Sequence, residues 1–131
     1  MAVMLICLLI SLVLPIVAKA PVALAMHQLA GYDNRHPREQ QAKLEGFGAR
    51  ALAAHKNSFE AIAYFTPAVV TVIALGAIDD TAKLLAMCFV ASRIIYLLCY
   101  WFNLHVVRSI FWVIGFACSI MLLVRLLLAF G

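Results

Sequence analysis

The sequence predicts an all-α integral membrane protein that folds as a single four-helix bundle over residues 1–131. The first observation is composition: the chain is 66% hydrophobic and 12% charged, whereas soluble domains are about 45–50% apolar and about 25% charged. The second is length, because 131 residues accommodate four spans of roughly 20 residues each. So apolar a chain has too little polar surface to cover a water-facing globule. A soluble domain, a disordered chain and a nucleic-acid-binding protein are therefore excluded.

The first apolar run predicts a spanning helix over about residues 2–29. Its Ala-Lys-Ala segment at 18–20 resembles a signal-peptide cleavage site. However, no basic residue precedes the run, and the apolar sequence resumes at Pro21. We therefore expect an uncleaved helix, kinked at Pro15 and Pro21, with Lys19 extending toward the membrane surface.

Three further spans follow, separated by polar connections. The first connection, over 31–49, is rich in residues that break or cap helices. The second is the turn at 79–81, where we expect Asp80 or Thr81 to cap the third span, and the last is the break at 103–105. The predicted spans cover about 51–78, 82–102 and 106–130.

Basic residues determine the expected orientation, because loops rich in Lys and Arg stay in the cytoplasm. The ten Lys and Arg residues outnumber the six Asp and Glu residues, and most lie around the first and third connections. The second connection has only Lys83 beside two aspartates. We predict that the first and third connections are cytoplasmic and that both termini lie on the other side, where Arg125 extends to the surface. The basic residues concerned are Arg35, Arg38, Lys43, Arg50, Lys56, His105 and Arg108.

Polar side chains inside the second and third spans need an explanation, because an ionisable group within a bilayer costs a few kcal/mol. In the second span they recur at i, i+7, i+10 and i+14, and in the third at i, i+3 and i+7. Both spacings place the side chains on one helical face. These residues are Arg50, Asn57, Glu60 and Tyr64 in the second span and Arg93, Tyr96 and Tyr100 in the third.

Glu60 and Arg93 are predicted to lie at the same depth. Glu60 is about nine residues, roughly 13 Å, past the cytoplasmic start of its span, and Arg93 is about nine residues before the cytoplasmic end of the antiparallel third span. A buried ion pair that only joins two helices is one interpretation. The accompanying polar side chains favour the other, a polar pocket that opens toward the cytoplasm.

The charge of this pocket predicts a small ligand with more negative than positive charge. Arg50, Lys56, Arg93 and Arg108 face a single acid, Glu60. Arginine binds carboxylates in bidentate fashion, and glutamate can hold an ammonium group. Glutathione, with its carboxylates, ammonium and thiol, fits this pattern, and an adjacent cation lowers a thiol pKa from about 8.5. Other anionic metabolites and lipid headgroups also fit the charge.

The segment from Arg50 to Ala61, centred on Asn57-x-x-Glu60, resembles the second-helix signature of the MAPEG family, the membrane-associated proteins of eicosanoid and glutathione metabolism. Two later motifs are similar to the third helix of that family and to the start of the fourth. The resemblance extends over most of the chain. These motifs are Arg93-x-x-Tyr96-x-x-x-Tyr100 and Arg108-Ser109.

This resemblance implies a homotrimer that binds glutathione between neighbouring subunits near the cytoplasmic side. It implies that Asn57 and Glu60 hold the glutathione backbone, that Arg108 stabilises the thiolate, and that a lipophilic second substrate enters from the bilayer. Arg50 and Lys56 lie near the carboxylate-binding basic positions of the family. The remaining residues that would line the cleft are Arg93, Tyr96 and Tyr100.

The chain departs from the family pattern near the second-helix motif. Ala53 stands where many members carry an arginine, and residues 61–63 replace a proline that often follows the glutamate. The segment from Asn34 to Arg38 looks like that of a bacterial subgroup, which implies a bacterial inner membrane.

The predicted function is that of a glutathione transferase-like or peroxidase-like membrane enzyme, which activates the glutathione thiol for reaction with a lipophilic electrophile. One alternative, motivated by Ala53, is a non-catalytic protein of the same fold that binds a lipid or an anionic metabolite. Another is a small proton-coupled exporter that uses Glu60. No metal site is expected, because the four histidines lie on different segments, and the four cysteines are interpreted as buried small hydrophobic residues.

Overall fold

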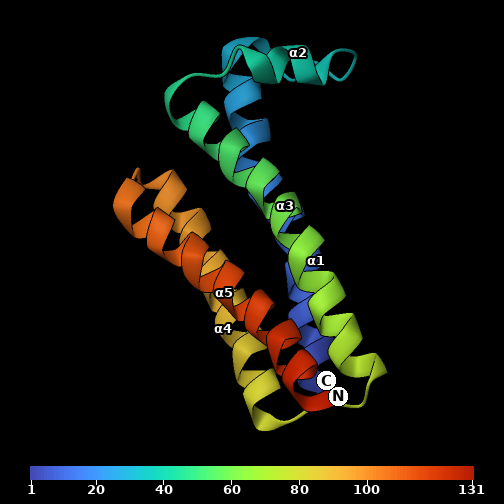
Figure 1. Ribbon diagram of the computed structural model, residues 1–131. Helices are drawn as coiled ribbons and strands as arrows, with labels where there is room; N and C mark the ends of the chain where they lie inside the picture. Colours follow the sequence, from blue (N-terminus) through green and yellow to red (C-terminus); the bar gives the residue numbers. More distant parts are fainter.

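The computed structural model describes residues 1–131, and all of its regular secondary structure is helical (Figure 1). Four of the helices are long and apolar enough to cross a membrane, so the predicted all-α membrane bundle is confirmed. A short additional helix, α2, lies in the connection after the first of them. The helices are α1 (Ala2–Ala30), α2 (Pro37–Ala42), α3 (Gly46–Ala74), α4 (Asp80–Trp101) and α5 (His105–Phe130).

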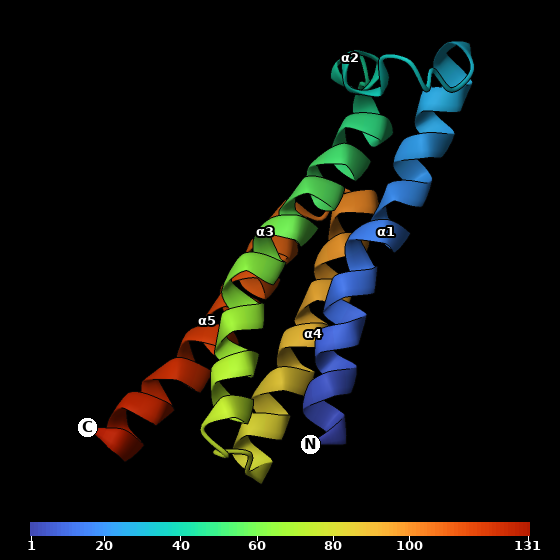
Figure 2. The same cartoon turned by 90° about the vertical axis from the view of Figure 1, so that its right-hand side faces the viewer.

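The long helices form two antiparallel pairs, α1 with α3 and α4 with α5 (Figure 1). The pairs meet at the end that carries both termini and the α3–α4 turn, and their backbones diverge toward the end that carries α2. In the view turned by 90°, α1 and α3 also reach beyond the α4–α5 turn at the α2 end (Figure 2). The up-and-down order thus places the first and third connections together, as the predicted orientation requires.

The largest buried cluster fills the end at which the two pairs meet and contains side chains from all four long helices. At its centre Phe65 of α3 stacks on Phe89 of α4, with ring centroids 3.7 Å apart and ring planes 5° from parallel. Met4 of α1 and Leu122 of α5 are completely buried in the same cluster. Within a bilayer, such contacts hold helices together through close packing rather than through exclusion of water.

The second long helix covers Gly46–Ala74 rather than the predicted 51–78. Gly48 does not break the helix but lies inside α3. Helix α1 approaches so closely there that an added Cβ would be 3.0 Å from the Cβ of Ala25. The helix ends before Gly76, whose φ of 64° is the left-handed conformation that terminates helices. The cap of α4 also differs from the prediction, since Asp79 accepts a hydrogen bond from the backbone N–H of Ala82 at 2.7 Å.

The first connection is folded rather than irregular. Pro37 begins α2. Its fixed φ suits a helix, and the N–H that proline lacks would have no acceptor within the helix at this first position. The Gln40 amide of α2 donates to the carbonyls of Met26, at 3.1 Å, and Gly31, at 2.6 Å. The backbone N–H groups of Arg35 and His36 both donate to the Asp33 carboxylate, and they lower the pKa of Asp33. These contacts tie the connection to the end of α1.

Some single-residue predictions meet different outcomes. Helix α1 continues through Pro15 and Pro21 without a break in its helical assignment. Arg125 lies at the end with the termini, where its guanidinium hydrogen-bonds the Asp79 carboxylate. The prediction that all four cysteines are buried is wrong for Cys88, which is exposed on the outer face of α4.

Candidate functional site

Three polar side chains form a continuous hydrogen-bonded chain between α3 and α4. Nη2 of Arg93 donates to Oδ1 of Asn57 at 2.7 Å. Nδ2 of Asn57 in turn donates to Oε2 of Glu60 at 2.6 Å. Asn57 and Glu60 are three residues apart on α3, so one helical turn presents both to the same side. The amide therefore links an arginine inside the bundle to a carboxylate at its surface.

Arg93 is buried to an unusual degree for a cation, because only 1% of its surface is exposed. Its Nε and Nη1 have no hydrogen-bond partner within the protein. One face of the guanidinium lies over the Tyr96 ring, 4.0 Å from the ring centroid, and such a cation–π contact recovers part of the lost solvation. A buried charge with unused donors is costly, and its presence marks this position as a functional candidate.

A second cation, Arg108 of α5, lies near the end of α4 and is connected to Arg93 through two tyrosine rings. The ring of Tyr100 meets that of Tyr96 edge to face, with centroids 5.2 Å apart. The guanidinium of Arg108 lies 4.3 Å from the centroid of the Tyr100 ring. Along the α4–α5 pair, two tyrosine rings therefore lie in a row between two cations, Arg93 and Arg108.

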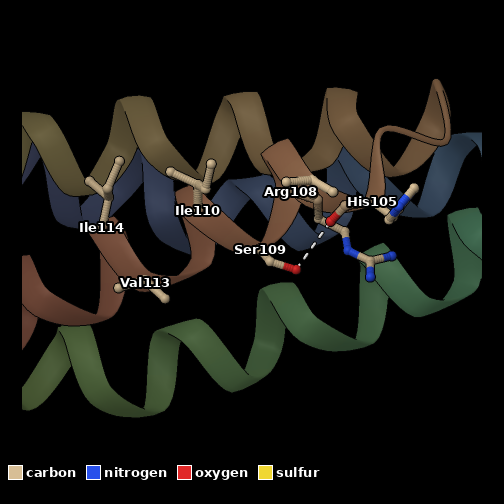
Figure 3. A pocket seen from close by; sticks show the side chains of 7 residues that line it. His105, Arg108, Ser109, Ile110, Val113 and Ile114 are labelled. Carbon is tan, nitrogen blue, oxygen red and sulfur yellow. Dashed lines mark hydrogen bonds between the residues drawn. The ribbon is translucent and has the colours of Figure 1, made fainter.

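Arg108 also borders a groove on α5 of about 560 Å³ (Figure 3). One end of the groove is polar, and there Oγ of Ser109 donates to the carbonyl of His105 at 3.1 Å. The other end is aliphatic. The groove therefore combines a cation with an apolar surface, which suits a ligand of mixed polarity. Its apolar lining consists of Val106, Ile110, Val113 and Ile114.

A sequence model of the MAPEG family matches residues 3–128 of the chain. The protein belongs to the MAPEG family. No curated protein and no solved structure gave a significant match to the chain. The family assignment therefore depends on the match over nearly the whole chain.

In this MAPEG protein the predicted site residues form two connected groups. Arg93, Asn57 and Glu60 are joined by hydrogen bonds, with Asn57 as the link between the other two. They do not form the direct ion pair that was one interpretation of the sequence, because Asn57 lies between them. Tyr96, Tyr100 and Arg108 continue from Arg93 through ring contacts.

Arg50 and Lys56 do not join either group within this chain. Arg50 precedes Asn57 by about two helical turns, roughly 10 Å along α3. Its Nε is buried without a hydrogen-bond partner. Lys56 and Glu60 are both exposed on the surface of the single chain. This side of the site is therefore open in a single chain, and the polar pocket that opens toward the cytoplasm stays a prediction.

Two features of the site were missed in the sequence. Nδ1 of His55 lies 2.9 Å from the carbonyl oxygen of Pro15, so this histidine links α3 to α1 beside the motif. The groove on α5 was missed as well, although Val106, Ile110 and Ile114 recur every four residues. That spacing was a usable signal for one apolar helix face.

Proposed function

We propose that this MAPEG protein is a membrane-embedded enzyme that activates the thiol of glutathione for reaction with a lipophilic electrophile. The observation that carries the proposal is the linked set of Arg93, Asn57 and Glu60, extended to Arg108 by cation–π and edge-to-face ring contacts. It offers cations for carboxylates, a carboxylate for an ammonium and amide groups for a peptide backbone. The unused donor of Arg50 fits an anionic tripeptide.

Each side chain has a distinct role in this proposal. Asn57 and Glu60 hold the peptide backbone and the ammonium of glutathione, while Arg50 and Lys56 attract its carboxylates. Arg93 keeps Asn57 in place, and Tyr96 and Tyr100 line the cleft. Arg108 lies beside the sulfur, where its positive charge favours the thiolate over the thiol. The apolar part of the α5 groove admits the lipophilic substrate from the bilayer, so both reactants are held close together.

The proposal includes a homotrimer in a bacterial inner membrane, with both termini away from the cytoplasm. Exposure of Lys56 and Glu60 on one chain supports an assembly in which a neighbouring subunit closes the cleft. The basic first and third connections lie at the same end of the bundle, which supports a cytoplasmic position for that end.

Thiolate absorbance tests the role of Arg108. When glutathione is titrated into the purified full chain in detergent, the wild type should develop a thiolate band at neutral pH. Arg108→Ala should lose the band, and conjugation to a lipophilic aryl halide should fall by about tenfold or more, because one unit of thiol pKa is about 1.4 kcal/mol. Arg108→Lys should keep part of both signals, since it keeps the charge.

Arg35→Ala is the matched control, because this exposed arginine lies in the first connection away from the site. It should behave like the wild type. An Arg108→Ala protein with an unchanged band and unchanged conjugation would contradict the mechanism. Glutathione binding without turnover of any electrophile would instead support the non-catalytic alternative.

A further inference from the structure

A small cavity lies against Arg93. It has a volume of about 10 Å³ and is lined by side chains of α1, α3 and α4. This is close to the smallest volume that can hold one water molecule. Its polar lining consists of Ser11, Ser58 and Arg93, and Leu14, Ile62 and Phe89 are among its apolar neighbours.

The hydrogen-bonding groups around this cavity are complementary to water. Arg93 brings the two donors, Nε and Nη1, that no protein atom accepts from. The hydroxyl of Ser11 already donates to the carbonyl of Leu8 at 2.7 Å, and that of Ser58 donates to the carbonyl of Ala54 at 2.9 Å. Each serine oxygen therefore has only lone pairs left to offer. Donors from one side and acceptors from the other are what a single water molecule needs.

We infer that Arg93 binds one buried water molecule between α1, α3 and α4, and that Ser11 and Ser58 are its other two partners. The water accepts from the Arg93 guanidinium and donates one hydrogen to each serine oxygen, which gives the three hydrogen bonds typical of a buried water. An anion is a poorer occupant, because it would face two serine oxygens that have no hydrogen left to donate.

This water gives the two serines a positioning role. It holds the guanidinium through Nε or Nη1 while Asn57 holds Nη2, so Arg93 is held at two points. Pro15 has no backbone N–H to donate to the carbonyl of Ser11, four residues earlier in α1. The carbonyl oxygen of Ser11 is therefore a further hydrogen-bond acceptor on this helix. The inference concerns the ligand-free protein, so it does not depend on glutathione being the substrate.

Melting temperatures of serine variants without glutathione test the inference, and the chain supplies a matched control for each. Ser119 has the same burial as Ser58 and the same bond to the carbonyl four residues earlier. Ser92 repeats the bond of Ser11 to the carbonyl three residues earlier. Neither is among the residues that line the cavity. Ser58→Ala and Ser11→Ala should each lower the melting temperature by about 3–6 °C more than Ser119→Ala and Ser92→Ala.

The same substitutions in an Arg93→Met background distinguish a water bridge from ordinary packing. The extra loss caused by Ser58→Ala and Ser11→Ala should disappear there, because the water has lost its donor. Equal losses in both backgrounds would overturn the inference. If Arg93→Met does not fold, a high-resolution crystal structure of the wild type decides: a water within hydrogen-bond distance of Arg93 and both serines is expected. An empty cavity, or an anomalous bromide peak after soaking, would overturn it.

Discussion

Arg93 is the residue on which the candidate site depends. A cation in the hydrocarbon layer is tolerated when its charge is delocalised over neighbours or serves a ligand. Here the charge is shared among Asn57, the face of Tyr96 and, through the amide, the Glu60 carboxylate. Removing any one of these partners should therefore show how much that partner contributes to the stability of the protein.

Replacing Asn57 by leucine should be strongly destabilising. Arg93 would lose the only hydrogen bond that the protein gives its guanidinium, and bonds to charged groups are worth about 1.5–3 kcal/mol. We expect the free energy of unfolding of the purified protein to fall by about 2–3 kcal/mol. The same change at Asn34, an exposed asparagine of the first connection, should have little effect. Equal stability of the two variants would show that Asn57 does not hold Arg93.

At the scale of elements, close contacts at small residues hold the helices together. Gly48 lets α1 approach α3, and Gly115 lets α5 approach α4 near Ser92. At the opposite end from α2, the Asp79 carboxylate caps α4 and also contacts Arg125 of α5. The contacts near Asp79 close the end at which the two helix pairs meet, whereas the pairs diverge toward α2 (Figure 1).

Gly115→Ala should destabilise the bundle although alanine is the better helix former. The new Cβ would lie 2.7 Å from Oγ of Ser92, and such overpacking costs about 1–3 kcal/mol, more than the gain of about 1 kcal/mol in helix propensity. In a Ser92→Ala background the clash is absent, so the same substitution should become neutral or stabilising. A chemical-unfolding series of the four proteins measures both signs, and a loss that persists without the Ser92 hydroxyl would refute the clash.

Asp79 should make the stability depend on pH in the acid range. The hydrogen bond from Arg125 and the one from the Ala82 N–H lower the pKa of Asp79. A carboxylate with a lowered pKa stabilises the fold above its ordinary value of about 3.9, and this contribution is lost as the pH falls through the lowered value. Melting temperatures should therefore fall less steeply on acidification in Asp79→Asn than in the wild type. Parallel acid profiles of the two proteins would contradict a role of Asp79 in the pH dependence. Asp33→Asn is the control, because Asp33 is the other carboxylate whose pKa is lowered.

At the scale of the whole molecule, helix lengths indicate where the site lies in the membrane. Helix α4 has 22 residues, about 33 Å at 1.5 Å per residue, which matches a hydrocarbon layer of about 30 Å. Helices α1 and α3 have 29 residues each and extend beyond the α4–α5 turn at the α2 end (Figure 2). We therefore expect Arg108, in the first turn of α5, to lie at the membrane surface, where the two substrates of the proposed function would meet.

The sequence was sufficient for features that depend on spacing along a helix. The four spans follow from hydropathy, and the proximity of Glu60 and Arg93 follows from residue counts in two antiparallel helices. The role of Asn57 between them depends on side-chain rotamers, which spacing does not determine. The exposure of Cys88 depends on how α4 is rotated in the bundle. Helix α2 was missed because its six residues are too few for a periodic signal.

Native mass spectrometry of the full chain, released from detergent with glutathione present, tests the central claim most directly. We predict a complex of three chains that retains glutathione in the wild type and loses it in Glu60→Gln, while Glu39→Gln, a change in the exposed α2 helix, leaves retention unaltered. A single chain without retained thiol peptide, or equal retention by Glu60→Gln and the wild type, would contradict glutathione binding at the Arg93, Asn57 and Glu60 site.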